Sequence, residues 1–163
     1  MADDRQAKPL KLPAIDPNTL ARQKGIAVYP AEFRALVAGR IRQVLGDPLG
    51  LKNLGVNLTT LEPGSWSSIR HWHTRQDEFI FVVKGELTLV SDEGEQVLTS
   101  GMAAGFPAGS KNGHHLVNRS SEPATYLEVG DRTAGDEAFY PDADLEFRSR
   151  RVFVHRDGTP YAS

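Results

Sequence analysis

Short runs in which apolar and polar residues alternate fill the middle of the chain. Each run is bounded by glycine, proline, asparagine or aspartate, which favour turns. The pattern predicts strands at 54–61, 67–73, 78–83, 86–90, 95–98, 114–118 and 125–129. Residues 101–109 are mostly small and are predicted to form a connection. Many short strands with such punctuation are typical of an antiparallel β-sandwich or barrel.

A helical pattern precedes these strands. Pro30 suits the first turn of a helix, and Gly46 suits its end. Between them, apolar residues recur every three or four positions, so the sequence predicts one helix at about 31–45. Its apolar face would consist of Phe33, Leu36, Val37, Ile41 and Val44.

The segments that flank this region have no clear period. Residues 1–28 are predicted to form an N-terminal arm, and residues 29–130 to form the barrel with its preceding helix. Residues 131–163 contain a short predicted strand at 151–155 and several aromatic residues. This C-terminal extension is therefore expected to dock on its own barrel or on a partner subunit.

Two histidines one residue apart give the first indication of chemistry. Successive side chains of a strand point to opposite faces, so His71 and His73 share a face. Glu78 begins the next predicted strand, and the short polar turn before it allows the three side chains to meet. Two imidazoles and one carboxylate are typical ligands of a divalent metal ion. Because the chain contains no cysteine, its ligands must be nitrogen and oxygen atoms.

Length and charge limit the class of protein. A chain of 163 residues, with 39% hydrophobic and 25% charged residues, suits one domain with its own core. A net charge of -2 gives no support for a nucleic-acid or anionic-membrane surface. No apolar run approaches the ~20 residues that span a bilayer. The acidic N-terminus lacks the apolar core of a signal peptide, so a cytoplasmic location is expected.

Two longer motifs contain the candidate ligands. The first consists of Gly64, His71, His73, Glu78 and Gly85. The second consists of Gly101, Pro107, Gly109, His114 and Asn118. In their order and spacing they resemble the two motifs of the cupin family, and the resemblance spans residues 54–130. The gaps before His71 and before His114 are longer than the family pattern, and the additional residues fall in predicted turns.

The resemblance implies an all-β fold, the double-stranded β-helix or jelly roll of a cupin barrel, with one short N-terminal helix. It implies one divalent ion, Fe, Mn, Ni or Zn, held by His71, His73, Glu78 and His114. His115 is the rival of His114, which is preferred because it stands four residues before Asn118, as in the family. A small organic ligand in the barrel and a homodimer are also implied by the family.

Further candidate residues surround these ligands. Tyr126 and Glu128 share one face of the last predicted strand. If that face is interior, Glu128 is a candidate base and Tyr126 a candidate proton donor. Arg70, Gln76 and Asp77 are candidates for hydrogen bonds to the ligands.

Cupins include many kinds of protein, so several functions stay open. A metal-dependent isomerase of sugars or sugar phosphates needs a base such as Glu128. A dioxygenase binds dioxygen beside its substrate in a mostly apolar cavity and needs no separate base. The alternative to both enzymes is a non-catalytic module that binds or senses a small ligand or a metal. An intact set of ligands argues against an inert structural barrel.

Overall fold

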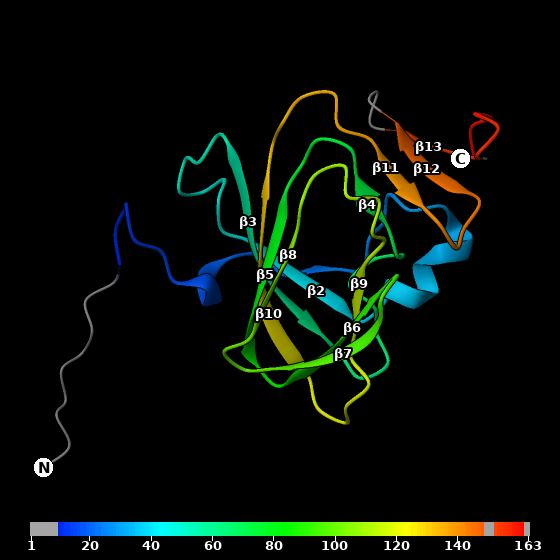
Figure 1. The fold of residues 1–163 in the computed structure, drawn as a ribbon. Helices are drawn as coiled ribbons and strands as arrows, with labels where there is room; N and C mark the ends of the chain where they lie inside the picture. Colours follow the sequence, from blue (N-terminus) through cyan, green and yellow to red (C-terminus); the bar gives the residue numbers. More distant parts are fainter. Residues whose placement is uncertain (1–9, 149–151, 162–163) are drawn as a thin grey trace, which may run out of the picture.

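The structure is a computed structural model that describes residues 10–148 and 152–161 (Figure 1). The first nine residues of the predicted arm, residues 149–151 of the extension and residues 162–163 lie outside the described part. The described helices are two short 3-10 helices, η1 (Pro17–Thr19) and η2 (Ala31–Val37). Neither of them has the length and apolar character that crossing a membrane requires.

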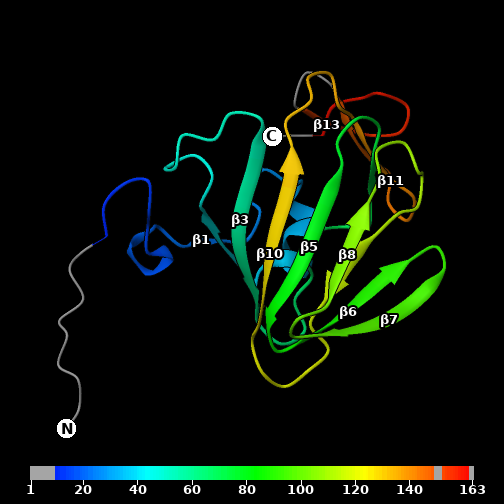
Figure 2. The ribbon, with the colours of Figure 1, turned by 60° about the vertical axis from the view of Figure 1, so that its left-hand side comes forward.

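The largest sheet forms one wall of the molecule. Its strand order is β1 (Gln23–Lys24), β2 (Arg40–Val44), β3 (Leu54–Leu61), β10 (Ala124–Asp131), β5 (Glu78–Lys84) and β8 (Ala103–Phe106), and all pairs are antiparallel. β3, β10 and β5 lie side by side at its centre (Figure 2). On β5, Ile80 and Val82 are buried. Phe79, Phe81 and Val83 alternate with them and face outward, as a pleated strand requires.

A smaller sheet faces the large one. It contains β7 (Gly94–Thr99), β6 (Glu86–Ser91) and β9 (His115–Val117), joined in that order. The buried apolar cluster between the sheets consists of Leu61, Ile80, Val82, Leu87, Leu89, Leu98, Leu116, Ala124 and Tyr126. Antiparallel sheets that face each other around such a core form a jelly roll. The predicted all-β jelly-roll class is therefore confirmed.

The C-terminal extension forms a third sheet beside the predicted metal ligands. Its strand order is β13 (Val152–Val154), β12 (Leu145–Arg148), β11 (Ala138–Tyr140) and β4 (Trp72–His73). A second buried apolar cluster consists of Tyr29, Val37, Ile69, Ala138, Tyr140 and Leu145 and joins this sheet to η2. In the register of β4 and β11, Ala138 pairs with His73. The extension thus packs on its own barrel, at the strand that carries a candidate ligand.

The predicted helix at 31–45 is wrong in its second half. η2 ends at Val37, and Arg40–Val44 is strand β2, which pairs with β3. Gly39 lies between the two elements, where a β-carbon would come within 2.9 Å of the Glu62 side chain. Ile41 and Val44, which helical spacing places on one face, are three residues apart and so lie on opposite faces of β2. Pairing with β3 decides the conformation here, because tertiary context overrides a weak local preference.

Two further predictions need correction. Of the predicted strand at 67–73, only Trp72–His73 is strand, and residues 67–70 form bends. The predicted connection at 101–109 contains strand β8, which pairs with β5. In this pairing Gly105 lies opposite Phe79, and Ala103 opposite Phe81. The small residues that suggested a loop instead fit beside large aromatic ones.

Candidate metal centre

The first motif brings its two histidines and its glutamate to one point. His71 Nε2 and His73 Nε2 each lie 3.7 Å from Glu78 Oε2. One ligand atom from each of the three residues lies within 4.8 Å of the other two. Two ligand atoms that each lie about 2.1 Å from the same octahedral ion are about 3 Å apart when they occupy adjacent positions and about 4.2 Å apart when they occupy opposite positions. His71, His73 and Glu78 are therefore positioned to bind a metal ion.

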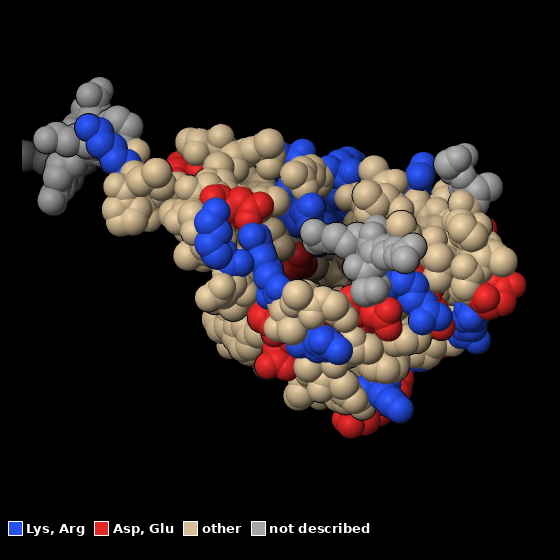
Figure 3. Space-filling view, turned by 90° about the horizontal axis from the view of Figure 1, so that it is seen from above, with Lys and Arg blue, Asp and Glu red and all other residues tan. Residues whose placement is uncertain are grey.

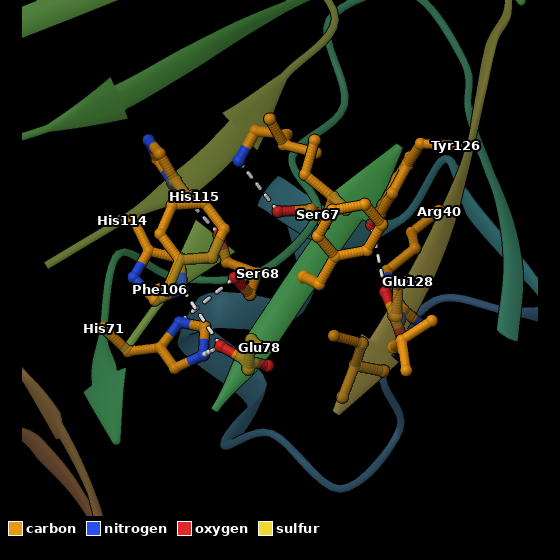
Figure 4. Close-up of a pocket in the computed structure, with 15 residues that line it drawn as sticks. Arg40, Ser67, Ser68, His71, Glu78, Phe106, His114, His115, Tyr126 and Glu128 are labelled. Atoms are coloured by element: carbon orange, nitrogen blue, oxygen red, sulfur yellow. Dashed lines mark hydrogen bonds and ion pairs between the residues drawn. The ribbon is translucent and has the colours of Figure 1, made fainter. Parts of the chain in front are cut away.

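His114, rather than His115, faces Glu78 (Figure 4). His114 Nε2 lies 2.9 Å from Glu78 Oε2. His115 uses its Nδ1 for a hydrogen bond with the carbonyl oxygen of Ser68, at 3.1 Å. The ring of His115 packs edge-on against Trp66, with centroids 4.5 Å apart. This geometry favours the alternative in which His114 is the fourth ligand.

The Nδ1 atoms of His71 and His114 bond to the main chain. His71 Nδ1 lies 2.9 Å from the carbonyl oxygen of Ile69, and His114 Nδ1 lies 3.2 Å from that of Asn112. A carbonyl oxygen only accepts hydrogen bonds, so the Nδ1 atom of each ring is the donor. In the neutral His71 ring, Nε2 then presents its lone pair toward the centre, which is the orientation that a metal ligand needs. His114 turns its Nε2 toward the same centre, where it lies within hydrogen-bond distance of Glu78.

The Nδ1 atom of His73 has a side-chain partner that sequence analysis missed. Asp136, in the loop between β10 and β11, places Oδ2 at 2.5 Å from it. The expected partners Arg70, Gln76 and Asp77 make hydrogen bonds to residues other than the candidate ligands. In the sequence, Asp136 is marked only by the turn that it forms with the preceding glycine. Nothing in that signal points to His73.

The ionisation states of His71 and Glu78 favour binding of a cation. Burial lowers the pKa of His71 to about 4, so its imidazole is neutral at pH 7. Burial alone would raise the pKa of Glu78, but the hydrogen bond from His114 and the nearby imidazoles lower it to about 2. Neutral imidazoles and an ionised carboxylate are the forms that bind metals. Because lone pairs converge here, a divalent ion with nitrogen and oxygen preference fits the site.

A cavity of about 130 Å³ opens beside these residues. Its wall includes His71, Glu78 and His114 on one side and Arg40, Tyr126 and Glu128 on the other (Figure 4). β10 thus turns Tyr126 and Glu128 to the interior, which is the condition that the sequence left open. The cavity combines a candidate metal centre with a separate carboxylate.

Three side chains hold the Glu128 carboxylate. Arg40 Nη2 donates to both carboxylate oxygens at 3.1 and 3.2 Å, Asn57 Nδ2 donates at 2.9 Å, and the Tyr126 hydroxyl donates at 3.2 Å. Burial would lower the pKa of Arg40, but the charge of Glu128 outweighs it and raises this pKa. Burial, with Glu128 beside it, raises the pKa of Tyr126, so the phenol stays protonated. Sequence analysis missed Arg40 because it placed the residue in a helix.

A second and more polar cavity, of about 510 Å³, adjoins His73. Its wall includes Gln76, Asp131, Arg132 and Asp136. Seen from above, the molecule has a hollow with acidic and basic side chains around it (Figure 3). The His73 side of the centre therefore faces a polar space, and the first cavity meets the side formed by His71 and His114.

Comparisons with known proteins identify the family. The family model described as Cupin domain matches residues 57–130. A solved structure described as a sugar phosphate isomerase from a cupin superfamily, from Silicibacter pomeroyi, is 44% identical in sequence. That similarity covers 93% of this chain and 98% of the other, with a TM-score of 0.86. The chain belongs to the cupin superfamily.

More distant structures agree with the fold. A candidate sugar phosphate isomerase from Acidithiobacillus ferrooxidans is 26% identical, over 76% of this chain and 81% of that one, with a TM-score of 0.68. The polyketide cyclase RemF from Streptomyces resistomycificus is 17% identical, over 72% and 78%, with a TM-score of 0.59. At this identity the cyclase shows only a common fold. No curated protein matches the sequence of this chain.

Proposed function

We propose that this cupin is a metal-dependent isomerase that acts on a small sugar or sugar phosphate. In this proposal His71, His73, Glu78 and His114 hold the metal ion. The observation that carries the proposal is the Glu128 carboxylate in the wall of the cavity beside these ligands. An isomerase of this type needs a base close to the ion, whereas a dioxygenase does not.

The strand register brings Glu128 close to the metal ligands. Glu78 on β5 pairs with Gly130 on β10, and Glu128 lies two residues from Gly130 on the same face. Diagonal neighbours of this kind have α-carbons about 7–8 Å apart. Both carboxylates line the same cavity, which would hold the reacting carbons of a sugar.

The proposed reaction moves one proton between neighbouring carbons. The chemistry that a divalent ion held by these ligands would supply is Lewis-acid polarisation of the substrate carbonyl group. Glu128 removes the proton from the carbon that carries the hydroxyl group and delivers it to the former carbonyl carbon. The hydroxyl proton passes to the former carbonyl oxygen, so aldose and ketose have the same composition. Arg40 and the protonated Tyr126 orient the Glu128 carboxylate through their hydrogen bonds.

The size and polarity of the cavities support this substrate class. A cavity of about 150 Å³ is known to hold a molecule the size of benzene. The first cavity, at about 130 Å³ and lined by three of the candidate ligands and by Glu128, therefore suits the reacting end of a short sugar. A phosphate group would extend toward more polar surroundings. The similarity to a protein described as a sugar phosphate isomerase supports the same class.

The test is hydrogen exchange during turnover. Metal-loaded protein is incubated in heavy water with short aldoses, ketoses and their phosphates, and NMR follows the incorporation of deuterium at the reacting carbons. Glu128→Gln should retain the metal and lower the exchange rate by about 100-fold or more. Glu93→Gln, in the exposed turn between β6 and β7, is the matched control.

Two results would favour other functions. Oxygen consumption without isomerisation would point to a dioxygenase. Tight binding of a small ligand without turnover by the wild type would point to a non-catalytic binding or sensing module.

The proposal includes a homodimer formed through the outer face of the large sheet. Phe79, Phe81 and Val83 on β5 are 43%, 38% and 50% exposed. Val129 and Leu127 on β10 lie opposite Phe79 and Phe81 and extend the same outward face. Contiguous exposed apolar surface of this kind is typical of an interaction site. A second copy of the chain, with the same apolar face, would cover it.

A further inference from the structure

Asp136 lies far from the metal-binding motifs in sequence and next to them in space. It belongs to the C-terminal extension and is 63 residues from His73, whose Nδ1 lies 2.5 Å from its Oδ2. The Asp136 side chain is only 7% exposed. The contact is therefore largely shielded from solvent, and in such surroundings a hydrogen bond to a charged group is strong.

The other oxygen of the carboxylate is also engaged. Asp136 Oδ1 accepts hydrogen bonds from the backbone amides of Arg75 and Gln76, at 2.8 and 3.3 Å, and from the Thr74 hydroxyl at 3.3 Å. These donors belong to the turn that directly follows His73. The carboxylate is thus fixed by the same segment that carries the histidine, and it cannot rotate without losing these bonds.

A carboxylate determines which nitrogen of a histidine carries the proton. An ionised carboxylate only accepts hydrogen bonds, so His73 Nδ1 must donate and Nε2 must keep its lone pair. A carboxylate partner also raises the basicity of the ring as a ligand. His71 and His114 instead direct their Nδ1 atoms at main-chain carbonyl oxygens two residues away. Of the three histidines, only His73 has a carboxylate at its Nδ1 within the described part of the chain.

We propose that Asp136 is the positioning residue of His73 and that the C-terminal extension completes the metal centre through this hydrogen bond. The inference rests on the metal site of the proposed function. It adds that the affinity of the site for its ion depends on a residue outside both motifs.

Asp136→Asn tests this inference with little change in shape. The Asn carbonyl oxygen can still accept the bonds from the backbone amides of Arg75 and Gln76. Its NH₂ group would then face His73 Nδ1 and, as a donor, would favour the tautomer with the proton on Nε2. The dissociation constant for Zn²⁺ or Mn²⁺ should rise about 10- to 100-fold. Asp131→Asn is the control, because its carboxylate also accepts backbone amides but makes no hydrogen bond with a histidine among the described residues.

The tautomer itself gives a readout that a purely structural role would not change. Nitrogen NMR of the metal-free protein at mildly alkaline pH should show His73 protonated on Nδ1 in the wild type and in Asp131→Asn. It should show protonation on Nε2 in Asp136→Asn. Protonation on Nε2 in the wild type would overturn the inference even if the variant failed to fold.

The metal titrations separate this inference from the metal site. If Asp136→Asn binds the ion as tightly as the wild type while His73→Ala does not bind it, only the role of Asp136 is wrong. If His73→Ala also retains the ion, the metal site is wrong as well.

Discussion

The rings of Phe106 and His114 are stacked, with centroids 3.6 Å apart and planes inclined by 1°. Phe106 ends β8, in the segment that was expected to be a loop, and pairs in register with Glu78. The same aromatic ring therefore lies beside a candidate ligand of each motif. Strand β8 thus constrains the face of the His114 ring, in addition to the bond that its Nδ1 makes with the main chain.

Replacing Phe106 by leucine should weaken metal binding. Leucine keeps an apolar side chain at this position but offers no flat surface to the His114 ring. We expect the metal dissociation constant to rise by roughly ten-fold, which is the lower end of effects seen for groups that orient ligands. Isothermal titration of the metal-free protein measures it. Phe153→Leu, whose aromatic contacts lie in the second apolar cluster, should leave the constant unchanged.

The two adjacent histidines should behave differently. His114→Ala should lower the metal content of the purified protein sharply, because it removes the nitrogen 2.9 Å from Glu78. His115→Ala should leave the metal content unchanged and reduce thermal stability, because His115 packs on Trp66. Elemental analysis and circular dichroism check both variants. Loss of metal in His115→Ala, with full retention in His114→Ala, would reverse the assignment.

Asn118 should contribute to stability rather than to chemistry. It is fully buried, and its amide group donates at 2.8 Å to the carbonyl oxygens of Leu61 and Glu122. Its oxygen accepts from the amide and hydroxyl of Ser120. Asn118→Ala leaves buried partners without hydrogen bonds and should lower the free energy of unfolding by about 1–3 kcal/mol. Urea denaturation measures this value. Unchanged stability with lost metal would contradict the assignment.

A charge on the outer face of the large sheet should dissociate the proposed dimer. Phe81→Asp places a carboxylate at the centre of the exposed apolar surface of β5, where burial against a second copy would leave it unpaired. Light scattering should give the mass of two chains for the wild type and of one chain for the variant. Val97→Asp, on β7 at another exposed apolar position, is the control. A monomeric wild type would end the proposal of a dimer.

Local pattern accounts for much of the fold. The strand predicted at 54–61 is β3, and the alternation at 78–83 matches the burial along β5. The candidate ligands of the first motif could be found because His71, in a β-bridge just before β4, and His73, on β4, are two residues apart in extended chain, and Glu78 follows after one turn. Such features depend on residues a few positions apart, and the sequence displays them directly.

The features that sequence analysis missed depend on contacts between distant segments. Arg40 and Glu128 are 88 residues apart in the sequence and are joined by a hydrogen bond. Asp136 and His73 are 63 residues apart and are joined in the same way. The helical spacing at 31–45 resembled an amphipathic helix until pairing with β3 made its second half a strand. A single sequence contains no signal for such partners, because they are chosen by the packing of the completed sheets.

The hydrogen bond between His73 and Asp136 also has a consequence for the order in which the metal site forms during synthesis of the chain. A ribosome makes the chain from its N-terminus, so a nascent chain contains His71, His73 and His114 before residue 136 has been joined to it. Until then His73 has no carboxylate to hold its proton on Nδ1, and β4 has no β11 to pair with. On the proposed role of Asp136, binding of the ion at full strength would require a chain that already includes residue 136, after the strands of the barrel have been made.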